Sequence, residues 1–128
     1  MPLLFCRRPT FDAIPAEAIR IGNRCLLDGL GLSVAGAEEH SVQLLVEEAW
    51  HVGGRPDALL LTRANAKVPA PIAARVLGIT GHAHDWDDSQ VSIDPAHSYG
   101  LLNHPAIPFL SGALAMAQKV GGIDGRTL

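Results

Sequence analysis

The sequence has few cysteines, no excess of positive charge and no long apolar segment. Two cysteines, Cys6 and Cys25, are too few for a disulfide framework and indicate reduced thiols in a cytoplasmic protein. The formal net charge of −3 argues against binding to nucleic acid or to anionic membranes. No apolar run approaches the roughly 20 residues that cross a bilayer, and the N-terminus lacks the order of charge and apolar residues of a secretory signal. We therefore expect a soluble, cytoplasmic protein.

The length and the apolar composition indicate the class of the domain. Of the 128 residues, 48% are hydrophobic and 18% are charged, which is typical of one globular domain with a real core. Apolar residues recur at helical spacing in four segments, whose ends are marked by prolines and glycines. The fold class is therefore predicted to be all-α and mostly helical, with an irregular N-terminus over residues 1–10 and one domain over residues 11–128.

The first two helices are placed by their capping and breaking residues. The first begins near Pro15 and extends to about Val34, and the glycines within it indicate close packing against another helix or breaks. Ser41 is predicted to cap the second helix, which stops at the glycine pair that starts with Gly53. The residues expected on the buried face of this second helix are Leu44, Leu45, Ala49 and Val52.

The second half of the chain predicts one short strand and two further helices. Residues 58–62 are apolar and bounded by turn residues, as in a brief strand. A third helix begins at Pro69 or Pro71 and leads into a segment rich in histidine. After a loop over residues 88–103, the last helix covers about 108–120 and is stopped by a second glycine pair.

Titratable side chains are concentrated between Gly81 and His104. Four of the six histidines and four aspartates lie in these 24 residues, beside a scaffold that is otherwise apolar and sparsely charged. Such a concentration is the default place to look for chemistry. Its members are His82, His84, His97 and His104 together with Asp85, Asp87, Asp88 and Asp94.

Three interpretations of this segment remain open from the residues alone. His82, His84 and Asp85 could supply metal ligands, but two histidines at this spacing share a face on a strand and diverge by roughly 200° on a helix. Alternatively, Asp85 acts as a base beside a carboxylate substrate, with His104 as its charged partner. The third interpretation is structural: the histidines are hydrogen-bonded loop residues and a helix is capped by Asp87, Asp88 and Ser89.

The same segment resembles the signature of a known enzyme family. Residues 81–89 read GHAHDWDDS, similar to a family run A-H-x-x-D-F/Y-D-D-T, and HPAIP follows at residues 104–108. Residues 14–18 and 26–36 resemble the family segments L-P-x-E-x and L-D-x-L-G-x-x-x-A-G. Through these four motifs, residues 11–128 resemble the MmgE/PrpD family, which includes 2-methylcitrate dehydratase, cis-aconitate decarboxylase and iminodisuccinate epimerase.

The resemblance implies a fold and a reaction class. It implies the N-terminal part of a large helical domain, without the α+β lid domain that family members also carry. The family's chemistry centres on a proton α to a carboxylate, with dehydration, decarboxylation or epimerisation of a small polycarboxylic acid. The resemblance implies no metal and no cofactor, and a homodimer or association with a complementing chain.

The resemblance also assigns roles to individual residues. Asp85 falls on a catalytic acid–base position, and His104 falls on a catalytic histidine that faces a substrate carboxylate. His82 and Ser89 fall on substrate-binding positions, although Ser89 replaces the family's threonine. The interval from Ser89 to His104 is longer than in compact members. The lysine, tyrosine and histidine that the family contributes later in its sequence have no counterpart here.

These departures predict an incomplete chain that is inactive alone. Residues 124–128 read as the start of a helix that the chain does not continue, which also suggests a piece of something longer. Two alternatives stay open: a non-catalytic remnant or subunit that pairs with another chain, and a metal-dependent hydrolase that uses residues 82–85. If the chain is a piece, not all of its apolar residues should find partners within it, in particular Leu26, Leu30, Leu44, Leu45 and Ile79.

Overall fold

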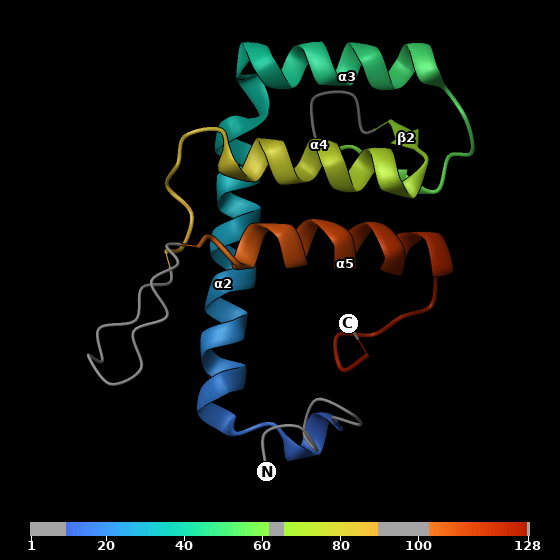
Figure 1. The fold of residues 1–128 in the computed structure, drawn as a ribbon. Coiled ribbons are helices and arrows are strands. Elements are labelled where there is room, and N and C mark those ends of the chain that lie inside the picture. Colours follow the sequence, from blue (N-terminus) through green and yellow to red (C-terminus); the bar gives the residue numbers. More distant parts are fainter. Residues whose placement is uncertain (1–9, 62–65, 90–102, 128) are drawn as a thin grey trace.

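Four α-helices and one short strand pair make up the part of the chain that the computed structural model describes, which is residues 10–61, 66–89 and 103–127 (Figure 1). The predicted all-α, mostly helical class is thereby confirmed. Residues 1–9, with Cys6 and nearly all of the predicted irregular N-terminus, lie outside the described residues. In chain order the elements are η1 (Phe11–Ala13), α2 (Ala16–Ala35), η2 (Gly36–Glu38), α3 (His40–Val52), β1 (Ala58–Leu59), β2 (Lys67–Val68), α4 (Ala70–His82) and α5 (Ala106–Val120).

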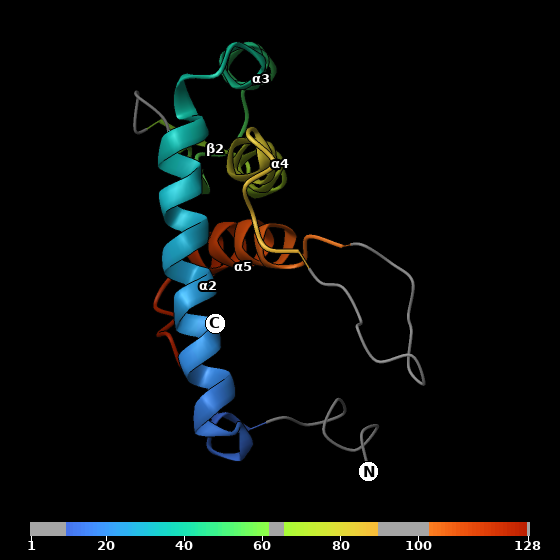
Figure 2. The ribbon, with the colours of Figure 1, turned by 90° about the vertical axis from the view of Figure 1, so that its left-hand side faces the viewer.

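The helices form a layer of three crossed by a fourth. Helices α3, α4 and α5 lie side by side with similar axes, and α2 crosses them near one end (Figures 1 and 2). Helix α4 runs opposite to α3 and to α5, so its last residues and the first residues of α5 meet at the same end, beside α2 (Figure 1). This arrangement brings the two ends of the histidine-rich segment together.

Glycines allow α2 and its C-terminal end to approach the other helices closely. Helix α2 begins after Pro15, as predicted, and continues without a break through its glycines. A Cβ on Gly29 would lie 2.5 Å from a Cδ of Leu110 in α5. A Cβ on Gly36, the residue that follows α2, would overlap the backbone oxygen of Thr80 in α4. Close packing is therefore the reason for glycine at these two positions.

The core lies between α3, α4, α5 and the strand pair. Strands β1 and β2 are antiparallel with Ala58 opposite Val68, and the Leu59 N–H donates to the Gln118 side chain of α5 at 3.0 Å. The strand at residues 58–59 confirms the predicted brief strand, while its partner β2 was not predicted. The buried residues of this core are Val42, Val46, Ala49, Ala58, Leu60, Val68, Ala70, Ala73, Val76 and Ala115.

Two predictions about α3 are wrong. The helix begins at His40, so Ser41 lies inside its first turn and caps nothing within the described residues. The expected buried face is also displaced, since Leu44 and Val52 are exposed and Leu45 is only half-buried. Helix α3 instead buries the i, i+4, i+7 set Val42, Val46 and Ala49, because that set faces α4 and the strands.

The other helix boundaries agree with prediction more closely. Helix α4 begins directly after Pro69, and glycines in the left-handed region end α3 at Gly53 and α5 at Gly121. Helix α5 begins at Ala106, two residues before the predicted Pro108. None of the helices in the described ranges is both long enough and apolar enough to cross a membrane.

Much apolar surface stays exposed, as predicted for unpartnered stripes. Leu26, Leu30, Leu44 and Ile79 are all exposed, and only Leu45 packs partly against the core. The most exposed apolar side chains include Leu27 on α2, at 74%, and Phe109 on α5, at 76%. Large apolar side chains among the described residues are thus left exposed on α2, α3, α4 and α5.

Candidate functional site

The chain reverses direction immediately after α4. His82 is the last residue of α4, and the Asp85 N–H donates to the His82 backbone oxygen at 3.0 Å. Asp85 adopts a φ of 56°, in the left-handed region, which aspartate tolerates better than most residues. This tight turn keeps Asp85 beside the end of α4, and Asp87 follows two residues later.

Asp88 connects the end of this turn to the start of α5. Its Oδ1 accepts a hydrogen bond of 3.0 Å from the Ala106 N–H, the first residue of α5. Because the first N–H groups of a helix have no partner within it, an external carboxylate stabilises that end. The structural interpretation of Asp88 as a helix cap is confirmed. The contact also fixes His104, two residues before α5, close to the turn.

Two histidines and two aspartates meet at this junction. His104 Nε2 lies 3.7 Å from Asp85 Oδ1, although the two residues are 19 positions apart, and His82 Nε2 lies 4.0 Å from the same oxygen. The two imidazole ring centroids are 5.1 Å apart. Beneath them, Asp87 Oδ1 lies 2.7 Å from His82 Nδ1 and 3.7 Å from His104 Nδ1. We call these four residues the His–Asp cluster.

The two carboxylates of the His–Asp cluster differ in exposure. The Asp85 side chain is 75% exposed, so it can meet a solute directly, whereas the Asp87 side chain is 1% exposed. A groove between α4 and α5 adjoins the cluster and is walled by His82, Asp87 and His104 but not by Asp85. The rest of the groove is mostly apolar and includes small residues such as Gly78.

The cluster also fits a divalent metal. One ligand atom from each of its four residues can be chosen so that all lie within 4.8 Å of one another. Imidazole nitrogens and carboxylate oxygens are ligands for zinc, iron and manganese. This set differs from the one considered in the sequence, because His104 and Asp87 join His82 and Asp85 in place of His84. His84 points away and stacks on Trp86, with ring centroids 4.4 Å apart.

The remaining predicted site residue, Ser89, is not part of the cluster. Ser89 is exposed, and no hydrogen bond within the described residues connects it to the cluster. Residues 90–102, with Asp94 and His97, lie outside the described residues. Sequence reasoning missed Asp87, which had been placed among helix-capping residues and instead bonds to His82. No sequence signal could have found this contact, because it depends on the turn at Asp85.

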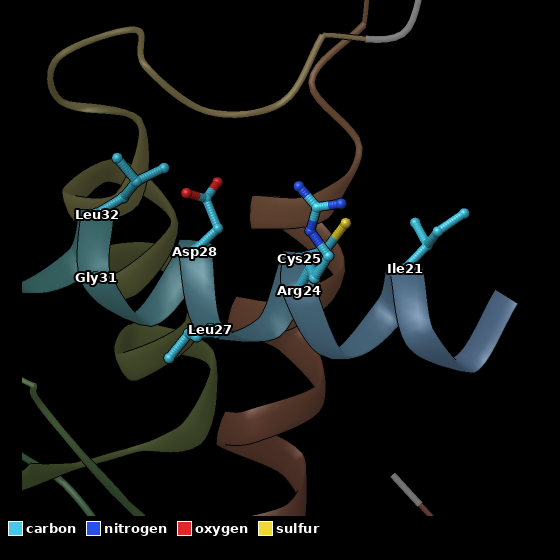
Figure 3. Close-up of a pocket in the computed structure, with 7 residues that line it drawn as sticks. All are labelled: Ile21, Arg24, Cys25, Leu27, Asp28, Gly31 and Leu32. Carbon is cyan, nitrogen blue, oxygen red and sulfur yellow. The ribbon is translucent and has the colours of Figure 1, made fainter. Parts of the chain in front are cut away.

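A second hollow lies along the outer face of α2 (Figure 3). Ile21, Arg24, Asp28 and Leu32 project from this face at helical spacing, and every lining residue belongs to α2. Within the described residues, neither Arg24 nor Asp28 has an ion-pair partner. A hollow lined by one helix does not gather groups from separate elements, so the His–Asp cluster is the better candidate for chemistry.

The fold and the cluster together define a mostly helical domain with paired histidines and aspartates at a helix junction. A family model described as MmgE/PrpD N-terminal domain matches residues 4–128, so the chain belongs to the MmgE/PrpD family. The match begins seven positions before the resemblance that the sequence motifs define. A comparison with curated proteins and one with solved structures gave no match.

Proposed function

We propose that this chain forms part of a lyase or isomerase that acts on a small polycarboxylic acid. The reaction would start from a proton α to a carboxylate and lead to dehydration, decarboxylation or epimerisation. The observation that supports this most is the approach of His104 Nε2 to within 3.7 Å of Asp85 Oδ1, across 19 positions of sequence. Membership of the MmgE/PrpD family supports the same reaction class.

In this proposal the residues of the cluster have separate roles. Asp85, with its exposed carboxylate, takes the α proton as general base. His104, as a cationic donor, holds a substrate carboxylate. His82 binds another polar group of the same acid. Ser89 adds a hydroxyl donor from the exposed side. None of these roles needs a cofactor.

We further propose that the active assembly includes more protein than these 128 residues. The exposed apolar faces of α2 and α5 support this, since they offer a surface for a second copy or for a complementing chain. The chain alone would bind the acid without turning it over.

We place the protein in the cytoplasm because its cysteine usage suits a reducing compartment, and Cys25 is free.

Isotope exchange tests the proposal directly. The chain would be incubated in D2O with citrate-like and aconitate-like acids, alone and with the product of any reading frame encoded immediately downstream. We expect deuterium at the carbon α to a carboxylate in the combined sample. The control is a monocarboxylic acid, which should show no incorporation. Failure of every polycarboxylate in an assembly that binds the chain would contradict the proposed reaction class.

Two other functions have some support. The ligand atoms of the His–Asp cluster are close enough to hold a metal, as a metal-dependent hydrolase would need. That function predicts one equivalent of metal that His82→Ala or His104→Ala removes. Our proposal predicts no stoichiometric metal in protein purified without chelator.

The exposed apolar faces equally suit a non-catalytic subunit. Such a subunit would bind another chain and show neither exchange nor affinity for polycarboxylates.

A further inference from the structure

A buried carboxylate lies beneath the two histidines of the cluster. Asp87 is the carboxylate, and its side chain is almost fully buried. Taking a carboxylate out of water is unfavourable unless cationic or hydrogen-bonding groups face it. Oδ1 of Asp87 faces His82 and His104, while Oδ2 has no hydrogen-bond partner within the described residues. The two imidazoles are therefore the groups that compensate the burial of Asp87.

Asp87 also accounts for the orientation of both rings. Each ring turns Nδ1 towards Asp87 and Nε2 towards Asp85. The distance of 2.7 Å from His82 Nδ1 is a hydrogen bond, whereas 3.7 Å from His104 Nδ1 is too long for one. His82 is thus the ring that Asp87 fixes most firmly.

The hydrogen bond determines where His82 carries its proton. With Asp87 ionised, its oxygens only accept hydrogen bonds, so the 2.7 Å contact then needs a donor at Nδ1 of His82. A neutral imidazole has one N–H, and the partner of one nitrogen decides the state of the other. In the neutral ring, Nε2 of His82 is then an acceptor that faces the exposed side of the cluster.

We propose that Asp87 is a positioning residue that holds His82 through Nδ1–H and presents its Nε2 as an acceptor beside Asp85. The position of the proton on His82 does not depend on the proposed function, but its chemical consequence does: a substrate hydroxyl can donate a hydrogen bond to Nε2. If that hydroxyl gives up its proton, the O–H bond breaks, its electron pair stays on oxygen and an N–H bond forms at Nε2. Asp87 then balances the charge of the imidazolium.

Nitrogen NMR of the imidazole rings tests this proposal without substrate. The full chain, labelled with 15N at histidine and treated with chelator, would be examined at a pH where the rings are neutral. His82→Gln identifies the His82 signals. We expect the proton of His82 on Nδ1 and a far-downfield Nε2 signal typical of an unprotonated nitrogen. A His82 ring protonated at Nε2 in the unmutated chain would overturn the proposal.

Variants of Asp87 and of the neighbouring Asp88 distinguish an effect on the His82 ring from a general effect on folding. In Asp87→Ala the Nδ1 preference of His82 should be lost, and in Asp87→Glu it should be restored in part. The matched control is Asp88→Ala, which removes the adjacent carboxylate but no contact to His82. An unchanged His82 signal in folded Asp87→Ala, checked by circular dichroism, would also overturn the proposal. Because no acid is added, these results are independent of the deuterium-exchange test.

Discussion

The junction between α4 and α5 and the outer face of α2 use their side chains in opposite ways. At the junction, residues distant in sequence converge, and polar groups face one another: Asp87 is buried against His82, and Asp88 caps α5. On α2, Leu27 and Val34 are 74% and 73% exposed, and none of the elements that the structure describes buries them. Both regions contain charged groups beside apolar ones.

The difference shows what distinguishes a candidate site from a candidate interface. A site needs groups held in relative position by separate elements, since reaction depends on their mutual geometry. An interface needs only exposed apolar side chains on one or two elements, such as Leu27 and Val34 on α2. The α4–α5 junction meets the first condition and α2 meets the second, so variants in the two regions should affect different measurements.

The largest expected effect is on catalysis at the junction. In an assembly that turns over substrate, Asp85→Asn should lower kcat on the order of 10²-fold or more, the usual scale for loss of an acid–base group. Asp88→Asn, which alters only the cap of α5, should lower it less. Steady-state assays of both variants with a panel of polycarboxylates measure this. Equal and mild losses would show that Asp85 is architectural.

A strong effect on stability is expected where α2 meets α4. Gly36→Ala should lower the free energy of unfolding by about 2 kcal/mol, because its Cβ meets the backbone oxygen of Thr80, which cannot rotate away. The matched control is Gly31→Ala on the open face of α2, which should raise stability by roughly 0.5–1 kcal/mol. Urea denaturation measures both. Equal effects of the two variants would contradict the close packing described here.

Substitutions on the outer face of α2 should weaken self-association and leave the free energy of unfolding nearly unchanged. We expect the chain to self-associate in analytical ultracentrifugation, and Leu27→Ser to weaken that association about tenfold through loss of one buried side chain. Ser89→Ala, at an exposed polar position, serves as a control. A monomeric unmutated chain with cooperative unfolding would show that this face needs no partner.

The smallest expected effect concerns the cap of α5. Asp88→Ala should lower the free energy of unfolding by about 1 kcal/mol, the typical value for loss of a helix cap. Thermal or urea unfolding beside Ser89→Ala measures the difference. Indistinguishable unfolding of the two variants would mean that the bond from the Ala106 N–H contributes nothing measurable.

Features set by local rules could be predicted from the sequence. Helices α2 and α4 begin directly after Pro15 and Pro69, and α3 and α5 end directly before glycines. Proline fixes φ and glycine permits the positive φ found at these helix ends, wherever the two residues occur. The buried face of α3 and the partner strand β2 could not be predicted in this way. They depend on which neighbours the helix and the strand meet in the folded domain.

The candidate site was predictable in part, and by a different route. Spacing alone does not bring Asp85 and His104 together, since they are 19 positions apart. Their pairing was one of three interpretations of the residues, and the resemblance to MmgE/PrpD favoured it. The role of Asp87 could not be inferred, because burial against His82 depends on the turn at Asp85. His82 and His84 do have separate partners, Asp87 and Trp86, but His84 lies in the turn after α4, so the helical argument does not apply to it.

The most direct test of the central claim is a titration of the chain with citrate, observed at the histidine side chains by NMR. The account predicts that signals of His82 and His104 shift together and saturate, at lower concentration for citrate than for acetate. The exposed His40 and His51 of α3 should shift little and serve as internal controls. Shifts of equal size at all four histidines, or none at His82 and His104, would contradict a polycarboxylate site at the α4–α5 junction.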